Sequence, residues 1–142
     1  MKRRDNQLRL RRFRVDELQR RLGTLEAIAT DLVRKLADLE ETVARERQRA
    51  NDTDLGRLAF PSFLKAMDSR RENLKATLNE IEREGAQTKT ELALAGQELK
   101  SFEIAAEQEA RRAAELPLQR SRMRLGDIAL ARQLRKQALR QI

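Results

Sequence analysis

The sequence predicts an all-α protein, a long antiparallel two-helix coiled-coil hairpin followed by a basic C-terminal helix that can be separate from the hairpin. Two long stretches carry apolar residues at the 3.5-residue period of a coiled coil. A run of turn-forming residues at 51–61 separates them. The 142 residues are 38% charged and 3% aromatic, a composition that can line a narrow seam but cannot fill a layered core. We therefore expect one hairpin over residues 1–116 and a basic helical tail over residues 117–142.

The first helix is expected from about residue 4 to about residue 50. Its apolar residues fall on two heptad positions and so form one stripe along the helix. Such a stripe requires a partner helix. The first position holds Leu8, Val15, Leu22, Ala29, Leu36 and Val43, and the second holds Leu18, Leu25, Leu32 and Leu39.

The second helix is expected to begin at Pro61, after a turn over residues 51–61, and to run to about residue 116. Proline at the first helical position loses no hydrogen bond, and its φ angle is already helical. The turn residues are Asn51, Asp52, Thr53, Asp54 and Gly56. The seam residues of this helix are Leu64, Leu78, Leu92, Leu99, Ala106 and Ala113 at one heptad position and Met67, Leu74, Ile81, Ala95, Phe102 and Leu116 at the other.

Folding the two ladders about residue 56 sets their register. It places Leu36 near Thr77, and it places Gly85 and Thr88 on the seam opposite Ala29. We interpret the last three residues as a thin layer of the core. Because each helix finds its partner in the same chain, we expect the isolated protein to be a monomer.

The basic tail is expected to form a helix of its own. Pro117 should end or kink the second helix, because proline lacks an N–H group and clashes with the preceding turn. The apolar residues of the tail fall on two faces. One face holds Leu125, Ile128, Leu139 and Ile142, and the other holds Met123, Leu130 and Leu134.

The net charge of +8 is distributed unevenly along the chain. Residues 1–14 carry a net +6, residues 15–110 a net −5 and residues 111–142 a net +7. A hairpin brings the two basic segments to one end, where we expect about thirteen net positive charges to form a basic foot. No apolar stretch reaches the ~18 residues of a membrane span. We expect a cytoplasmic protein that is at most peripheral to a membrane.

Several observations argue against catalysis. The chain contains no histidine and no cysteine, and a two-helix rod offers no concave site from which water is excluded. We interpret Glu40 and Glu41 as solvated surface. A string that begins at Asp52 superficially resembles a calcium loop, but Arg57 stands where that loop needs glycine and Phe63 where it needs a bidentate glutamate. We expect no enzyme activity, no metal site and no cofactor.

A basic-zipper DNA-binding helix is the main alternative, because four leucines spaced by seven follow an arginine-rich segment. The zipper register requires a leucine at Thr24, whereas Leu25 comes one residue late. One residue rotates a helix by about 100°, which turns the basic face away from the DNA. Phe13 is the only aromatic residue among the first arginines, so they carry no stacking platform for single strands. We expect no specific nucleic-acid binding. A basic coiled-coil nucleic-acid-binding protein and an unrelated coiled-coil adaptor remain the alternatives.

From Leu8 to about Glu82 the sequence resembles the flagellar export protein FliJ, in the form seen in alphaproteobacteria. The order and spacing of the matching segments carry the resemblance, because heptads alone are shared by all coiled coils. The resemblance fades after about Glu109. The matching segments are RLRRFRVDE at 9–17, EAIA at 26–29, DLE at 38–40, AFPSF at 59–63 and RRENLK at 70–75.

The resemblance implies an antiparallel coiled coil of the flagellar type III protein export apparatus. Members of this family are similar to the central stalk of rotary ATPases. They bind the hexameric export ATPase, contact the cytoplasmic domain of the export gate and escort export chaperones at the cytoplasmic face of the inner membrane. The resemblance therefore implies a stalk or adaptor with these partners.

The candidate partner-binding residues lie at the two ends of the expected rod. Cations at one end provide an electrostatic surface, and apolar residues at the turn provide a hydrophobic contact. The cations are Arg3, Arg4, Arg9, Arg11, Arg12, Arg14, Arg120, Arg122, Arg124, Arg132, Arg135 and Lys136, and the apolar residues are Phe60, Phe63 and Leu64.

Overall fold

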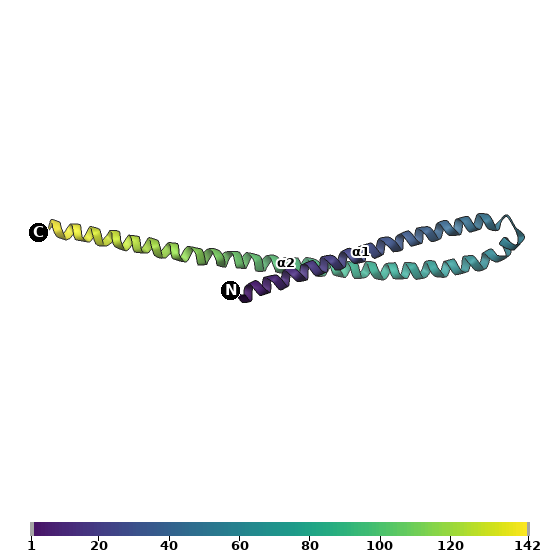
Figure 1. The fold of residues 1–142 in the computed structure, drawn as a ribbon, viewed down its shortest axis with the longest axis horizontal. Helices are drawn as coiled ribbons and strands as arrows, with labels where there is room; N and C mark the ends of the chain where they lie inside the picture. Colours follow the sequence, from purple (N-terminus) through teal and green to yellow (C-terminus); the bar gives the residue numbers. More distant parts are fainter. Residues whose placement is uncertain (1, 142) are drawn as a thin grey trace.

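The structure, a computed structural model, describes residues 2–141 as two long helices that form an antiparallel hairpin (Figure 1). Helix α1 spans Lys2–Ala50, and helix α2 spans Asp54–Arg140. At about 1.5 Å per residue, α2 is roughly 130 Å long. The predicted fold class, a long two-helix hairpin, is confirmed, and the predicted bounds of the first helix agree with those of α1 to within two residues.

The seam between the helices is built from the predicted heptad ladders. Four leucines of α1 are buried: Leu18, Leu25, Leu32 and Leu39. On α2, Thr88 is 2% exposed, and its hydroxyl donates to the carbonyl of Glu84 at 2.8 Å. Because its hydroxyl is satisfied within its own helix, this polar side chain can occupy the thin layer that the sequence predicts. The burial of the leucine ladder within one chain also leaves it unavailable for a basic zipper.

The turn is shorter than predicted. Only residues 51–53 separate the helices, and α2 begins at Asp54 rather than at Pro61. Thr53 caps the new helix, since its side-chain oxygen accepts a hydrogen bond from the Gly56 N–H at 3.0 Å. Pro61 therefore lies inside α2. Because proline has no N–H group, the carbonyl one turn back loses its usual hydrogen-bond partner, and this part of the helix surface is exposed.

Helix α2 also continues through Pro117, so the prediction of a separate C-terminal helix is wrong. Proline inside a helix costs about 3 kcal/mol or more because it removes one hydrogen bond and crowds the turn before it. Here both Pro117 and Ala113, one turn back, are exposed. Water can reach the freed carbonyl, and the flanking residues are mostly Ala, Leu, Gln, Glu and Arg, which favour helix.

Helix α2 extends well beyond the start of α1, as Figure 1 shows at its green and yellow end. We call residues 114–140 the overhang. It is roughly 40 Å long at the helical rise. Leu116, predicted as a seam residue, is 51% exposed, because the N-terminal end of α1, at Lys2, does not extend far enough to cover this position. Ala113 is exposed for the same reason.

Candidate partner-binding surfaces

The arginines at the start of α1 lie beside carboxylates of α2. Ion pairs join Arg4 to Glu109, Arg11 to Glu98, Arg12 to Glu103 and Arg14 to Glu91. The N–O distance is 3.0 Å for the Arg11 pair and 3.5 Å for the Arg12 and Arg14 pairs. Within residues 2–141, the other two predicted cations of this segment, Arg3 and Arg9, form no ion pair, and both are exposed.

Arg11 is the most enclosed of these arginines. Its guanidinium carbon lies 3.7 Å from the centre of the Phe102 ring, and its Nη1 donates to Glu98. Its Nε is buried and has no hydrogen-bond partner among the described residues. Stacking on an aromatic face and one charge-assisted hydrogen bond therefore offset the burial of this cation. Arg11 belongs to the joint between the helices rather than to a free basic surface.

This pairing corrects the expected basic foot. The two basic segments do lie at the same end of the hairpin, but they do not form one patch. The charges at the start of α1 are matched by acids of α2, and those of the C-terminal segment are spread along the overhang. The net positive charge that remains for a partner is therefore concentrated on the overhang.

The overhang carries the predicted C-terminal cations. All six are exposed, and none forms an ion pair within the part of the chain that the structure describes. Their positive charge is not offset by nearby acids, because the overhang contains only Glu115 and Asp127. These cations are Arg120, Arg122, Arg124, Arg132, Arg135 and Lys136.

The apolar residues predicted at the turn are partly buried. Phe60 and Phe63 lie with their ring centres 6.2 Å apart, and the Arg47 guanidinium lies 5.7 Å from the Phe60 ring. Leu64 is half-buried as well. These side chains close the end of the seam, which is the structural role that competes with partner binding.

Leu55 and Leu58 are instead the exposed apolar residues of the turn, at 78% and 81% exposure. They are three residues apart in the first turns of α2 and therefore share a face. The sequence did not predict this exposed pair, because residues 51–61 were expected to form a turn. The N-cap pattern, Thr53 followed by an acidic first turn at Asp54, was the signal that could have found the true helix start.

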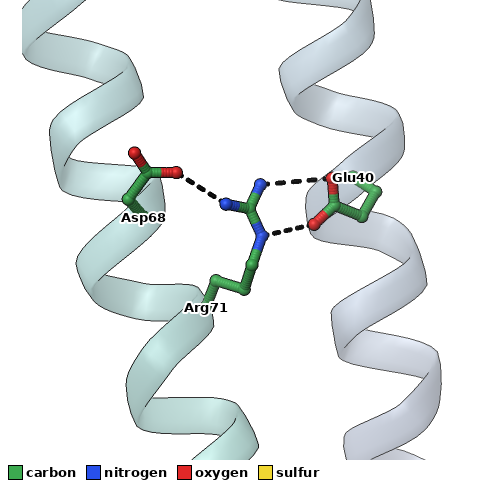
Figure 2. Close-up of polar contacts among 3 residues, drawn as sticks. All are labelled: Glu40, Asp68 and Arg71. Atoms are coloured by element: carbon green, nitrogen blue, oxygen red, sulfur yellow. Dashed lines mark hydrogen bonds and ion pairs between the residues drawn. The ribbon is translucent and has the colours of Figure 1, made fainter.

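A polar bridge that the sequence did not predict crosses the seam, as Figure 2 shows. Arg71 of α2 donates to both carboxylate oxygens of Glu40 in α1 and, at 2.6 Å, to Asp68 one turn back. Hydrogen bonds to Glu40 and then to Asp68 raise the pKa of Arg71 above its ordinary value. Its place in the sequence could have indicated the bridge, since Arg71 occupies the same heptad position as Leu64 and Leu78 and must therefore face the seam.

Within residues 2–141, no group of three or more acidic, histidine or cysteine side chains is arranged to hold a metal ion. No stretch of either described helix has the length and apolar character that crossing a membrane requires. Comparisons with protein families, with curated proteins and with solved structures return no match to this chain.

Proposed function

We propose that this chain is a stalk or adaptor of the flagellar type III protein export apparatus, which binds the export ATPase and links it to the export gate and to export chaperones. The observation that carries the proposal is the rod with two different exposed ends. Leu55 and Leu58 form an apolar tip, and the overhang forms a cationic end. The segments over residues 9–75 that resemble the FliJ family support the choice of this apparatus.

The proposed mechanism is binding rather than chemistry. The cationic overhang attracts an acidic surface and speeds association by electrostatic steering. The apolar tip provides a contact that buries Leu55 and Leu58 on a second surface. A stiff helical pair between these ends passes a change in the position of one partner to the other. In this proposal the protein acts in the cytoplasm, at the cytoplasmic face of the inner membrane.

The test mixes the purified chain with the flagellar export ATPase of the same organism. We expect the chain to raise the rate of ATP hydrolysis or to promote ring assembly, and we expect no hydrolysis by the chain alone. Phosphate release and sedimentation of the mixture measure the two effects. An ATPase that neither binds the chain nor changes its activity contradicts the proposal. A second coiled coil of similar charge serves as the control for unspecific effects.

Nucleic-acid binding is the alternative that the unpaired arginines of the overhang favour. Such binding, when unspecific, depends on release of counterions and weakens steeply with salt. We expect binding to DNA or RNA only at low salt, lost by about 200 mM salt. A site bound at physiological salt ~10³-fold more tightly than random sequence would favour the alternative. Fluorescence anisotropy over a salt series measures this difference.

A further inference from the structure

The two parts of the stem are held together in different ways. All the buried apolar residues of α1 lie within residues 18–50. We call residues 2–14 the N-terminal arm. Within the arm, only Leu8 and Arg11 are half-buried, and every other side chain is exposed, including those of Leu10 and Phe13 at 67% and 63%. The contact between the arm and α2 therefore buries little apolar surface.

Ion pairs provide most of the contact between the arm and α2. Four arginines of the arm pair with four glutamates of α2. In the Arg12–Glu103 and Arg14–Glu91 pairs, the four side chains are between 45% and 60% exposed. Ion pairs that are exposed to this degree are individually weak, and salt screens them.

The net charges of the two facing segments have opposite signs. Residues 2–14 carry seven Lys or Arg and one Asp, a net +6, whereas residues 91–109 carry five Glu and one Lys, a net −4. Charges interact over about 30 Å at 0.01 M salt but over only about 3 Å at 1 M salt. The attraction between the arm and α2 is therefore strong at low salt and largely screened at high salt.

The stem over residues 18–50 has an apolar seam that salt does not screen. Leu18, Leu25, Leu32 and Leu39 are between 1% and 7% exposed. The bridge between Arg71 and Glu40 lies beside these buried leucines rather than in place of them. The change from apolar to ionic contact occurs between Leu18 and the arm, over less than one turn of helix.

We propose that the N-terminal arm is an electrostatic latch, which opens from α2 as ionic strength rises while the stem over residues 18–50 stays closed. The end of a helix with few buried apolar contacts opens locally at a much lower free-energy cost than the rest of the fold. The arm is such an end, and the ion pairs are what keep it closed. This inference is independent of the proposed role in export.

Opening of the latch uncovers Leu99 and Phe102 of α2. The guanidinium carbon of Arg11 lies 3.7 Å from the centre of the Phe102 ring, and Leu99 is half-buried. Phe102 shares its heptad position with Leu116 and Met123, which are already exposed on the overhang. The latch therefore sets where the exposed apolar stripe of α2 begins, at Leu116 when it is closed and at Leu99 when it is open.

The first test measures the distance across the latch in the full chain, which contains no cysteine, so that labels can be placed by single substitutions. Spin labels at Asn6 and Ala105, both exposed, report on the latch. Labels at Glu41 and Ser69, also exposed, report on the stem beside the Arg71–Glu40 bridge. Excess unlabelled protein suppresses distances between copies.

From about 20 mM to about 1 M sodium chloride, the distance from Asn6 to Ala105 should lengthen and its distribution should broaden. The segment from Asn6 to Val15 is roughly 14 Å long, which sets the scale of the largest change. The distance from Glu41 to Ser69 should stay constant. If neither distance changes, packing holds the arm, and if both lengthen together, the hairpin opens as one unit. Either result would overturn the proposal.

The second test reverses charges at low salt. Arg12→Glu with Arg14→Glu should open the latch at about 20 mM salt, because it sets like charges against Glu103 and Glu91. Adding Glu103→Arg and Glu91→Arg to this variant restores opposite charges and should close the latch again. The distance from Asn6 to Ala105 measures both changes.

The matched control is Arg3→Glu with Arg9→Glu, which makes the same change of charge within the arm. Both residues are exposed and form no ion pair within residues 2–141, so this variant should open the latch much less. Equal opening by the two variants, or failure of the charge exchange to close the latch, would overturn the assignment of the latch to these ion pairs. The distance from Glu41 to Ser69 in each variant confirms that the rest of the hairpin stays folded.

A third test measures exposure of the covered stripe. Leu99→Cys should react with iodoacetamide, an uncharged reagent, about tenfold faster at 1 M than at 20 mM salt, because the rate follows the population of the open form. Leu74→Cys is the matched control, since Leu74 is also half-buried and lies one turn from Arg71 in the apolar part of the stem. Its rate should not change with salt. Equal acceleration of both thiols, or of neither, would overturn the proposal.

Discussion

Arg71 of α2 reaches across the seam and donates two hydrogen bonds to the carboxylate of Glu40 in α1, the one through Nη2 at 3.1 Å (Figure 2). This bidentate geometry joins the helices at one register, because both oxygens are in place only when the two residues face each other. The Arg71 side chain is 21% exposed, whereas that of Glu40 is 57% exposed. The bridge therefore lies at the edge of the seam, where it contributes alignment more than stability.

We expect Arg71→Leu to leave the melting temperature within about 4 °C of the unchanged protein, because leucine continues the apolar ladder and Glu40 remains hydrated. Arg71→Glu should lower the melting temperature clearly, since it adds a third carboxylate next to those of Glu40 and Asp68. Thermal circular dichroism measures both changes. A large destabilisation by Arg71→Leu would show that the bridge carries the fold rather than its alignment.

The pKa of Arg71 also predicts how this bridge responds to pH. Its folded pKa is raised by hydrogen bonds to Glu40 and Asp68. A raised pKa means that the stabilisation is complete below the unfolded value and disappears only as pH rises through the folded value, far above neutral. The difference in melting temperature between the unchanged protein and Arg71→Leu should therefore be constant from about pH 6 to about pH 9.

Two glycines give opposite predictions for the same substitution. A Cβ atom at Gly56 would lie 2.8 Å from the Thr53 side-chain oxygen and 3.1 Å from the Ala50 Cα atom, whereas a Cβ at Gly85 meets nothing within 4 Å. Gly56→Ala should destabilise the hairpin by about 1 kcal/mol by displacing the cap of α2. Gly85→Ala should stabilise it by about 0.5 to 1 kcal/mol through helix propensity. Urea unfolding measures both, and each variant is the control for the other.

The sequence predicted the seam because its signal is periodic and redundant. The apolar heptad pattern repeats over six or more turns of each helix, so single polar residues such as Arg71 and Thr88 do not obscure it. The two errors in the helix bounds both occurred at proline. A proline at an exposed position inside a long helix removes one backbone hydrogen bond, and water can bind the freed carbonyl. The cooperativity of the many helical turns on either side offsets the loss.

The binding surfaces could be predicted only in part, because a linear sequence does not say which charges meet. The arginines of residues 4–14 are a basic cluster in the sequence, but the fold sets four of them against glutamates that are 77 to 105 residues away in the chain. The overhang cations form no ion pairs with α1, because α1 begins at Lys2 and does not extend alongside the overhang. Leu55 and Leu58 are exposed on a helix that starts at Asp54. The sequence did not predict this exposure, because Pro61 was expected to be the first helical residue.

Continuity of α2 through Pro117 predicts a fixed distance across it. Spin labels at Lys100 and Lys136 are 36 residues apart in one helix, which corresponds to roughly 54 Å. We expect a narrow distance distribution near this value, and the same value for Pro117→Ala, which restores the missing hydrogen bond. Excess unlabelled protein suppresses distances between copies. A shorter or broad distribution that Pro117→Ala alone corrects would indicate a hinge at residue 117.

The last prediction assigns the two ends of the rod in the proposed complex with the export ATPase. Leu55→Ser with Leu58→Ser should reduce stimulation of ATP hydrolysis if the tip enters the ring, because it removes the two most exposed leucines of the turn. Arg122→Glu with Arg132→Glu should reduce it instead if the overhang docks on an acidic surface, and this loss should be largest at low salt.

The matched control for the tip variant is Leu10→Ser with Phe13→Ser, which removes apolar side chains of 67% and 63% exposure from the other end of α1. It should leave stimulation unchanged. Reversal of Arg11, Arg12 or Arg14 is not a clean test, because each forms an ion pair with α2 and its loss would weaken the hairpin itself. If the tip variant and the overhang variant both keep full helicity and full stimulation, neither end engages the ATPase, and an adaptor role elsewhere becomes the better account of this rod.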